Sequence, residues 1–254
     1  MNLTIKEVNE LYNQDRLTPE VIELLKLDER QGVKVILKKY QRKVEALERL
    51  ENQFKELSNF ENIYKHKGYN LLAGIDEAGR GPLAGPVVAA AVILPENFKL
   101  LGLTDSKQIS MTNRKLYFDY IIEHAISYHV EVIDAEIIDR VNIYEATKLA
   151  MIGSYRNLKV KPDYLLVDAV KLQVNDIPYD AIIKGDAKSI SIAAASILAK
   201  VTRDRIMEKY HGEYPEYNFK KHMGYGTKEH LEAIEKFGIR VIHRKSFSPI
   251  KEYI

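Results

Sequence analysis

The segment from Leu71 to Pro86 constrains this chain more than any other, because it places two carboxylates directly after an apolar run. Leu71–Ile75 predicts a buried strand, and Asp76 and Glu77 stand at its end, where open α/β sheets hold their ligands. Adjacent strand residues point to opposite faces, and two close carboxylates repel each other. Burying them without a partner is costly. The segment therefore predicts a strand end that binds a cation, and a divalent metal ion is the simplest candidate.

A glycine-flanked arginine follows the acidic pair: Gly79, Arg80 and Gly81. Glycines let backbone N–H groups approach a ligand closely, and a guanidinium matches the geometry of a phosphate. This turn and Ala84 also satisfy the G-x-G-x-x-G/A pattern of dinucleotide-binding proteins, but that pattern must open a helix. Two prolines flank the turn instead, and Val87–Leu94 is a second apolar run typical of a buried strand. We therefore expect a β-hairpin rather than a dinucleotide site.

Two further acids follow apolar runs. Tyr164–Val167 predicts a short buried strand that ends in Asp168, and the predicted strand 181–183 is followed by Lys184, Gly185 and Asp186. Four carboxylates gathered at one sheet would need metal ions to offset their charge. Mg²⁺ prefers oxygen ligands, and two such ions about 4 Å apart support in-line hydrolysis of a phosphodiester. The pattern predicts this chemistry at Asp76, Glu77, Asp168 and Asp186.

The remaining residues after position 100 alternate predicted helices and strands, which indicates an α/β domain. Helices are predicted from Thr112 or Asn113 to about 124, over 135–158 and over 189–210, with a strand at 127–133. Small residues at 193–195 and 199 permit close packing of the last helix on a sheet. A glycine-bracketed turn holds Tyr225 near several lysines, as nucleic-acid sites do. The basic tail, with Arg240, His243, Arg244 and Lys245, either binds duplex or caps the domain.

Residues 1–70 have a different texture, with charged residues alternating with apolar ones at helical spacing. Thr4 and Glu7 predict a capping box, Thr18 with the following proline predicts a second helix start, and 32–57 predicts one long amphipathic helix. The segment 65–68 is expected to be a linker. The long helix carries a cluster of basic residues without acids, which either contacts a phosphate backbone or is a solvated face: Lys34, Lys38, Lys39, Arg42 and Lys43.

The string Asp76–Pro86 resembles the opening motif of the ribonuclease HII family. Further segments resemble family motifs in family order: 105–107, 165–168, 184–186, 191–200, 224–227 and 243–247. The resemblance covers about residues 70–254. Ribonuclease HIII shares the fold, but Ala78 and Arg80 favour the HII family.

The resemblance implies a ribonuclease-H-like mixed sheet flanked by helices, in a catalytic domain 71–254 with a small helical region from about 211. A helical extension, 1–70, would precede it. The activity implied is that of an endonuclease dependent on two Mg²⁺ or Mn²⁺ ions. It would cut the RNA strand of RNA–DNA hybrids and the 5′ side of single ribonucleotides in duplex DNA, leaving 5′-phosphate and 3′-hydroxyl ends. Substrate contacts are implied for Gly79, Arg80, Gly81, Lys107 and Tyr225.

Two alternatives stay open at this point. A ribonuclease HIII or another nuclease of this fold, such as an integrase or junction resolvase, could use the same carboxylates, and a non-catalytic protein could bind hybrids. Composition is nearly neutral, with a net charge of +2, so any nucleic-acid surface must be local. The chain has no cysteine, and no apolar run is long enough to span a bilayer. We expect a cytoplasmic, monomeric protein that binds nucleic acid and no membrane.

Overall fold

The computed structural model describes residues 3–254, which separate into two compact units, one up to residue 53 and one from residue 54 onward. The first unit contains α1, α2 and most of α3, at Ile5–Asn13, Pro19–Lys26 and Gln31–Leu57. The predicted capping box is confirmed, because Thr4 Oγ1 accepts from the Glu7 N–H at 3.2 Å and Glu7 Oε2 accepts from the Thr4 N–H at 2.7 Å. The predicted long helix is also confirmed. These helices enclose a small apolar core of their own: Val8, Leu17, Leu25, Val33 and Ile36.

The second unit is built on a five-stranded sheet with the order β3-β2-β1-β4-β5. Its strands are β1 (Leu72–Ala78), β2 (Val87–Ile93), β3 (Ser127–Ile133), β4 (Tyr164–Asp168) and β5 (Tyr179–Ile182). β1 pairs antiparallel with β2 and parallel with β4, so the predicted hairpin and the predicted mixed sheet are both confirmed. β5 begins two residues before the predicted strand 181–183 and ends at Ile182.

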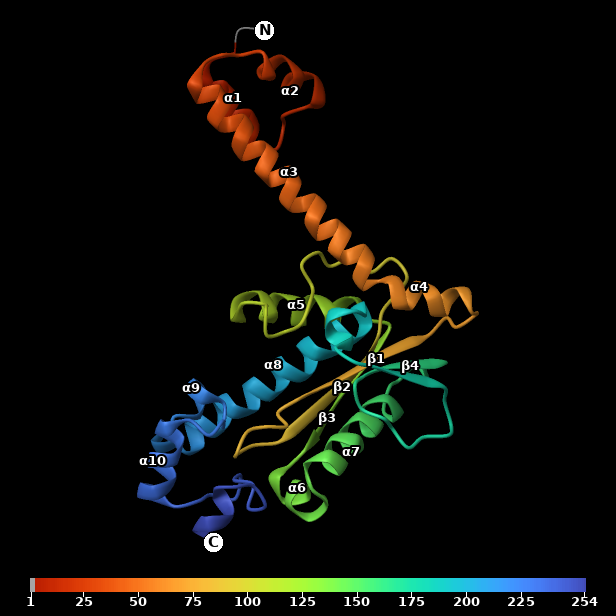
Figure 1. Cartoon of the computed structure of the whole chain (residues 1–254), viewed down its shortest axis with the longest axis vertical. Helices are drawn as coiled ribbons and strands as arrows, with labels where there is room; N and C mark the ends of the chain where they lie inside the picture. Colours follow the sequence, from red (N-terminus) through yellow and green to blue (C-terminus); the bar gives the residue numbers. More distant parts are fainter. Residues whose placement is uncertain (1–2) are drawn as a thin grey trace. The chain divides into compact units, whose positions relative to one another are not determined.

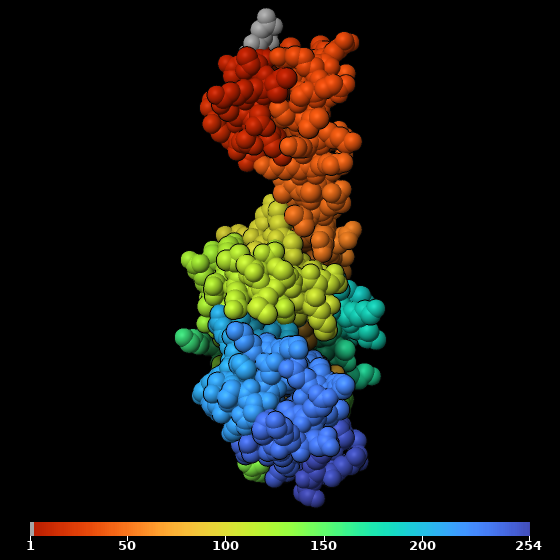
Figure 2. All heavy atoms as spheres, turned by 90° about the vertical axis from the view of Figure 1, so that its left-hand side faces the viewer, coloured from red at the N-terminus to blue at the C-terminus, as the bar shows by residue number. Residues whose placement is uncertain are grey.

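Helices cover both faces of this sheet (Figure 1). α5 (Met111–His124) and α8 (Ile190–Glu213) lie on one face, and α6 (Ala135–Val141) and α7 (Ile143–Arg156) lie on the other. β2 shows why both faces are apolar, since Val88, Ala90 and Val92 pack towards α8 while the residues between them pack towards α7. On the face shown in Figure 2, α5 in yellow-green adjoins the blue C-terminal region.

β1 and α8 approach each other unusually closely at Gly74. A Cβ atom on Gly74 would lie 2.0 Å from the Ser191 carbonyl carbon and 2.4 Å from the Ile192 nitrogen. The predicted small-residue face of α8 lies beside this contact and is fully buried, at Ala193, Ala194, Ala195 and Ala199. The strand that carries Asp76 is therefore held against the helix backbone with no side chain between them at this point.

The shorter elements include one that differs from the sequence prediction. α4 (Asn59–His66) occupies part of the expected linker, so Lys65 and His66 are helical, and Tyr64 stacks on Tyr164 with ring centroids 4.3 Å apart. The remaining short elements are α9 (Phe219–His222), α10 (Lys228–Phe237), and 3-10 turns at Gly185–Ala187, Pro215–Tyr217 and Ile250–Tyr253. Within residues 3–254, no helix is both long and apolar enough to cross a membrane.

Two helix boundaries also differ from the sequence prediction. Ser110, rather than Thr112 or Asn113, caps α5, and its side chain accepts from the Asn113 N–H at 3.3 Å. The single helix expected over 135–158 is broken at Asn142, which has a φ of 72°. The Asn142 side chain accepts from the Tyr144 and Glu145 N–H groups and so starts α7 as a new helix.

Candidate active site

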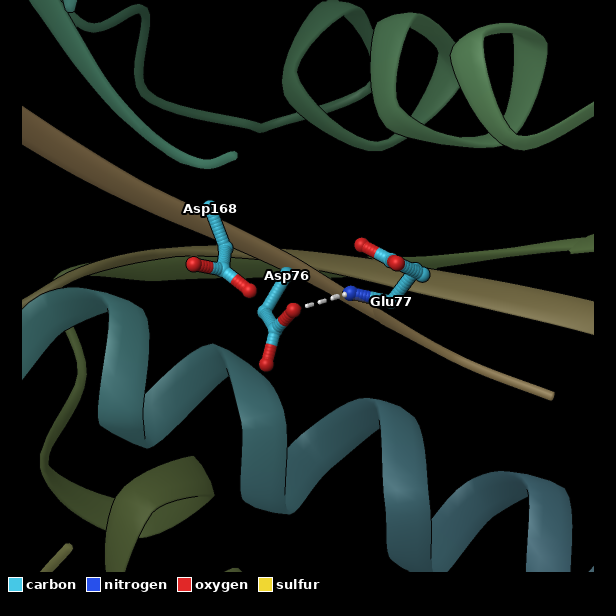
Figure 3. A group of neighbouring side chains, drawn as sticks. All are labelled: Asp76, Glu77 and Asp168. Atoms are coloured by element: carbon cyan, nitrogen blue, oxygen red, sulfur yellow. Dashed lines mark hydrogen bonds between the residues drawn. The ribbon is translucent and has the colours of Figure 1, made fainter. Parts of the chain in front are cut away.

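Neighbouring strands place two carboxylates side by side. Because Ile75 of β1 is paired with Val167 of β4, the next residue of each strand brings Asp76 next to Asp168. Glu77 completes the group, and one carboxylate oxygen from each of the three lies within 4.8 Å of the others. Figure 3 shows the Asp76 and Asp168 side chains next to each other, both extending from the strands towards α8. The three residues form a group that could hold a divalent metal ion.

Few donors neutralise these oxygens. Asp76 accepts from the Glu77 N–H at 2.7 Å, Asp168 accepts from the Gly185 N–H at 2.6 Å, and Glu77 Oε1 accepts from Arg80 Nη1 at 3.2 Å. Glu77 Oε2 is buried and has no hydrogen-bond partner among residues 3–254. A buried carboxylate oxygen without a donor is costly, so the donor set suits a cation that would occupy the space between these groups.

The electrostatics point the same way. Burial raises the pKa of Asp76 well above its usual range, and the neighbouring Glu77 and Asp168 carboxylates raise it further. Burial also raises the pKa of Glu77, although the charge of Arg80 lowers it in part. The pKa of Asp168 is likewise raised by burial and lowered in part by the hydrogen bond from the Gly185 N–H. The site therefore disfavours its own negative charge until a cation offsets it.

Asp186 lies on the same cavity but outside the tight group of three carboxylates. A left-handed residue, Lys184 with φ 57°, turns the chain after β5 and leads into the 3-10 turn that carries Asp186. Burial raises the pKa of Asp186, with Asp105 and Asp168 adding to the effect. Asp186 also raises the pKa of Asp76, so the two carboxylates sense each other across the cavity.

One cavity of about 290 Å³ brings together the four carboxylates and the five residues for which substrate contacts were implied. Its lining includes the four acids, the glycine turn, the lysine and the tyrosine: Asp76, Glu77, Asp168, Asp186, Gly79, Arg80, Gly81, Lys107 and Tyr225. Burial works against the charged form of Lys107, but the surrounding carboxylates, Asp105 foremost, together raise its pKa. Lys107 therefore stays cationic beside the acids.

The glycine turn faces the tyrosine. A Cβ on Gly81 would lie 3.6 Å from the Tyr225 ring, and that residue is 47% exposed. Gly79 has a φ of 95°, and a Cβ there would lie 2.1 Å from Arg203 Nε. Only glycine fits this position, both for its backbone angle and for the close approach of Arg203.

Besides Ala78, four residues of the lining were not predicted as site residues: Ser106, Ser196, Lys200 and Arg203. The last three lie on α8 at helical spacing, so one face of the predicted helix 189–210 carried the available signal. Ser196 Oγ donates to Ser106 Oγ at 2.9 Å, which ties α8 to the loop that carries Lys107. Lys200, which pairs with Asp204 at 2.7 Å, and Arg203, which donates to backbone carbonyls, are the cations that α8 adds to the lining.

The structure assigns part of the basic tail to the interior of the domain. His243 and Arg244 are fully buried, so they pack inside the domain and do not meet duplex. Arg240 pairs with Glu216 at 3.0 Å, and Lys245 is exposed.

Comparisons with known proteins agree with the geometry. The family model for Ribonuclease HII matches residues 73–250, and the model for the Ribonuclease HII N-terminal domain matches residues 4–65. A ribonuclease HII of Bacillus cytotoxicus is 51% identical over 252 residues, which cover 99% of this chain and 97% of that protein.

Solved structures show the same fold. The ribonuclease H2 of Pyrococcus horikoshii OT3 has a TM-score of 0.63 at 29% identity, over 72% of this chain and 97% of that one. The Archaeoglobus fulgidus ribonuclease HII, solved as a complex with PCNA, has a TM-score of 0.61 at 26% identity, over 70% of this chain and 96% of that one. The predicted fold class is thereby confirmed. The chain belongs to the ribonuclease HII family and is an endoribonuclease of the ribonuclease H class.

Proposed function

We propose that this enzyme cuts the RNA strand of RNA–DNA hybrids and also cuts duplex DNA on the 5′ side of a single embedded ribonucleotide, leaving 5′-phosphate and 3′-hydroxyl ends. The observation that carries the proposal is the position of the Tyr225 ring beside Gly81, where a Cβ on the glycine would lie 3.6 Å from the ring, on the same cavity as the carboxylate group. A turn of this kind meets one sugar through backbone atoms, and an aromatic ring stacks on the next.

The residues divide the work by position. Asp76, Glu77 and Asp168 would hold Mg²⁺ or Mn²⁺, and Asp186 would contribute to a second ion. Bound divalent ions would supply an activated water and charge stabilisation at the phosphate. Arg80 and Lys107 would bind phosphate oxygens, and the Gly79–Gly81 backbone would recognise the ribose 2′-hydroxyl. Tyr225 would stack on the following sugar and favour deoxyribose, whose 2′ carbon leaves room for the ring.

Three duplexes test this proposal: a DNA duplex with one ribonucleotide, an RNA–DNA hybrid and plain DNA. With Mg²⁺, the enzyme should cut the first on the 5′ side of the ribonucleotide, degrade the RNA of the second and leave the third intact. Sizing the products on a denaturing gel gives the result. A cut hybrid beside an intact single-ribonucleotide duplex would instead indicate the HIII-like alternative, and cut plain DNA would indicate another nuclease of this fold.

Tyr225→Ala should lower cutting of the single-ribonucleotide duplex about tenfold to a hundredfold, because stacking on an aromatic side chain is worth about 1–3 kcal/mol per base. Tyr225→Phe should keep most of the activity, since stacking uses the ring rather than the hydroxyl. Steady-state kcat/KM for each variant gives the measurement. Tyr253→Ala, at another exposed tyrosine, is the control. Equal losses in the Ala and Phe variants would show that the hydroxyl, not the ring, is what the substrate needs.

The basic face of α3 is proposed to contact phosphates. Lys34, Lys38 and Lys39 are exposed and have no ion-pair partner in the described part of the chain, whereas Lys43 pairs with Asp15. Replacing the three free lysines with Ala should weaken hybrid binding and reduce the slope of log K against log salt by about 0.9 for each phosphate that is no longer neutralised. Binding titrations at several salt concentrations measure both, with circular dichroism to check the helix. An unchanged slope would leave these lysines as a solvated face.

A further inference from the structure

The C-terminal segment 242–244 runs along the back of the substrate-facing turn. The Gly85 N–H donates to the Ile242 carbonyl and the Arg244 N–H donates to the Leu83 carbonyl, each at 2.8 Å. Ala84 and His243 form a β-bridge between these two bonds. These bonds fix the segment against the residues that follow Gly81. Its two buried polar side chains, His243 and Arg244, make hydrogen bonds to His230 and to the glycine turn.

Arg244 holds the inner side of the glycine turn. Its guanidinium donates to the Gly79 carbonyl at 2.5 Å, to the Arg80 carbonyl at 2.9 Å and to the Gly85 carbonyl at 3.0 Å. Its side chain is fully buried, and no carboxylate of residues 3–254 lies within ion-pair distance. The turn carbonyls therefore serve as its partners, which fixes the orientation of the two peptide groups next to the carboxylate site.

His243 acts on Tyr225 through His230. His230 Nδ1 lies 2.9 Å from the Tyr225 carbonyl, which only accepts, so Nδ1 must carry the proton. His243 Nδ1 accepts from the Arg240 N–H at 2.9 Å and lies further from the Arg240 carbonyl, at 3.3 Å. The His243 proton is therefore on Nε2, which donates to His230 Nε2 at 3.1 Å. One tautomer of each ring satisfies three hydrogen bonds: Arg240 N–H to His243, His243 to His230, and His230 to the Tyr225 carbonyl.

Both rings are held neutral. Burial lowers the pKa of His230 and of His243 to about 4 in each case. Adding a proton would place two N–H groups against each other at the Nε2 contact or against the Arg240 N–H. The chain of bonds from Arg240 through both histidines to the Tyr225 carbonyl is therefore complete at neutral pH.

We infer that the adjacent residues His243 and Arg244 form a positioning clamp that sets the gap between the 2′-hydroxyl-reading turn and the Tyr225 ring. Arg244 fixes the turn, and His243 fixes the tyrosine through His230. The clamp contacts neither the carboxylates nor the substrate. It therefore affects the preference for a ribose followed by a deoxyribose, and not the rate of the hydrolytic step. This inference rests on the proposed function, since it assigns a role within the same site.

Two substitutions at His230 separate positioning from mere packing. Asn places its amide near the Nδ1 position and can still donate to the Tyr225 carbonyl, whereas Gln places its amide near Nε2 and cannot. His230→Gln should lower the ratio of kcat/KM for the single-ribonucleotide duplex over the hybrid about tenfold, while His230→Asn should keep it within about twofold. His124→Gln is the matched control, because His124 Nδ1 makes the same contact with a carbonyl, that of Tyr120, on α5. Equal falls in the ratio for Asn and Gln would overturn the clamp.

A readout independent of cleavage decides the same question. Histidine-selective ¹⁵N NMR of the full chain at pH 7 should show His230 protonated on Nδ1 and His243 on Nε2, and the Tyr225 ring signals should shift in His230→Gln but not in His230→Asn. The opposite tautomer or a protonated ring at either histidine would overturn the clamp. If the wild-type enzyme cuts neither duplex, the proposed function fails, and the NMR result alone then decides the positioning of Tyr225.

Discussion

Replacing Asp76 with Asn should lower kcat at least about a thousandfold, an effect of about 4 kcal/mol on the barrier. Asp76 is the buried centre of the carboxylate group, and the amide would remove the charge that a divalent ion needs. Hybrid affinity should change little, because phosphate contacts position the substrate from other residues. Single-turnover cleavage and a binding titration measure the two quantities separately. Near-normal turnover at saturating Mg²⁺ would remove Asp76 from the catalytic group.

The same substitution should stabilise the metal-free protein. Ionised Asp76 is a buried carboxylate among like charges, and burial and those charges raise its pKa, which means that its ionisation opposes folding. Relief of such a conflict typically stabilises by about 0.5–2 kcal/mol. Asp163→Asn is the matched control, because Asp163 accepts from the Asn70 and Leu71 N–H groups at 2.7 and 3.0 Å, outside the site. It should destabilise the fold and leave kcat unchanged. Thermal unfolding in EDTA should show a higher Tm for Asp76→Asn and a lower Tm for Asp163→Asn than for the wild type. A lower Tm for Asp76→Asn would contradict this account.

Acidification from pH 6.5 to pH 4 should cost the fold about 3 kcal/mol for a single buried histidine. The unfolded chain takes up a proton on histidine near pH 6.5, but folded His230 and His243 take it up only near pH 4. Their contribution is therefore complete above pH 6.5 and is lost as the pH falls through this window. Groups facing the pair include Arg240, whose positive charge disfavours protonation of His243, and His222, which disfavours protonation of His230 when it is itself protonated.

The effect must be measured as a difference between a variant and the wild type. Buried carboxylates such as Glu61 have raised pKa values, so their protonation stabilises the fold on acidification and opposes the effect of the histidines. Urea unfolding at several pH values should show a smaller loss of stability on acidification for His230→Asn than for the wild type, by about 3 kcal/mol. The surface substitution His124→Gln serves as the control. Parallel curves for wild type and His230→Asn would mean that His230 is protonated in the folded state as readily as in the unfolded chain.

The carboxylate site was predictable because its signals are local. An apolar run that stops at an acid marks the end of the apolar part of a strand. β4 ends at Asp168, and the apolar run of β1 ends at Asp76, although β1 itself continues for two more residues to Ala78. Parallel pairing then brings these ends together without any further information. The hairpin followed in the same way, from two apolar runs and the prolines between them.

The features that the sequence did not predict depend on partners distant along the chain or on single residues with unusual backbone angles. Glu61 looks like any charged helical residue, yet it is buried and accepts from Ser189 Oγ at 2.5 Å and from the Ser191 N–H at 3.0 Å. Arg244 looks like part of a solvated basic tail, but its carbonyl partners lie about 160 positions earlier. Asn142 breaks a continuous helical pattern by adopting a positive φ that most residues avoid. The spacing of apolar residues along the sequence does not predict such long-range hydrogen bonds or backbone angles.

The close contact of Gly74 with the start of α8 limits which residues position 74 can accept. β1 carries Asp76, and α8 carries Ser196, Lys200 and Arg203, so both elements line the cavity. Any side chain at position 74 would push the strand away from the helix backbone, because even a methyl group would overlap the Ser191 carbonyl. The close spacing of the two elements that line the active site thus depends on the lack of a side chain at position 74. Among single-nucleotide changes in the codon for residue 74, only those at the third position keep glycine and so keep this spacing.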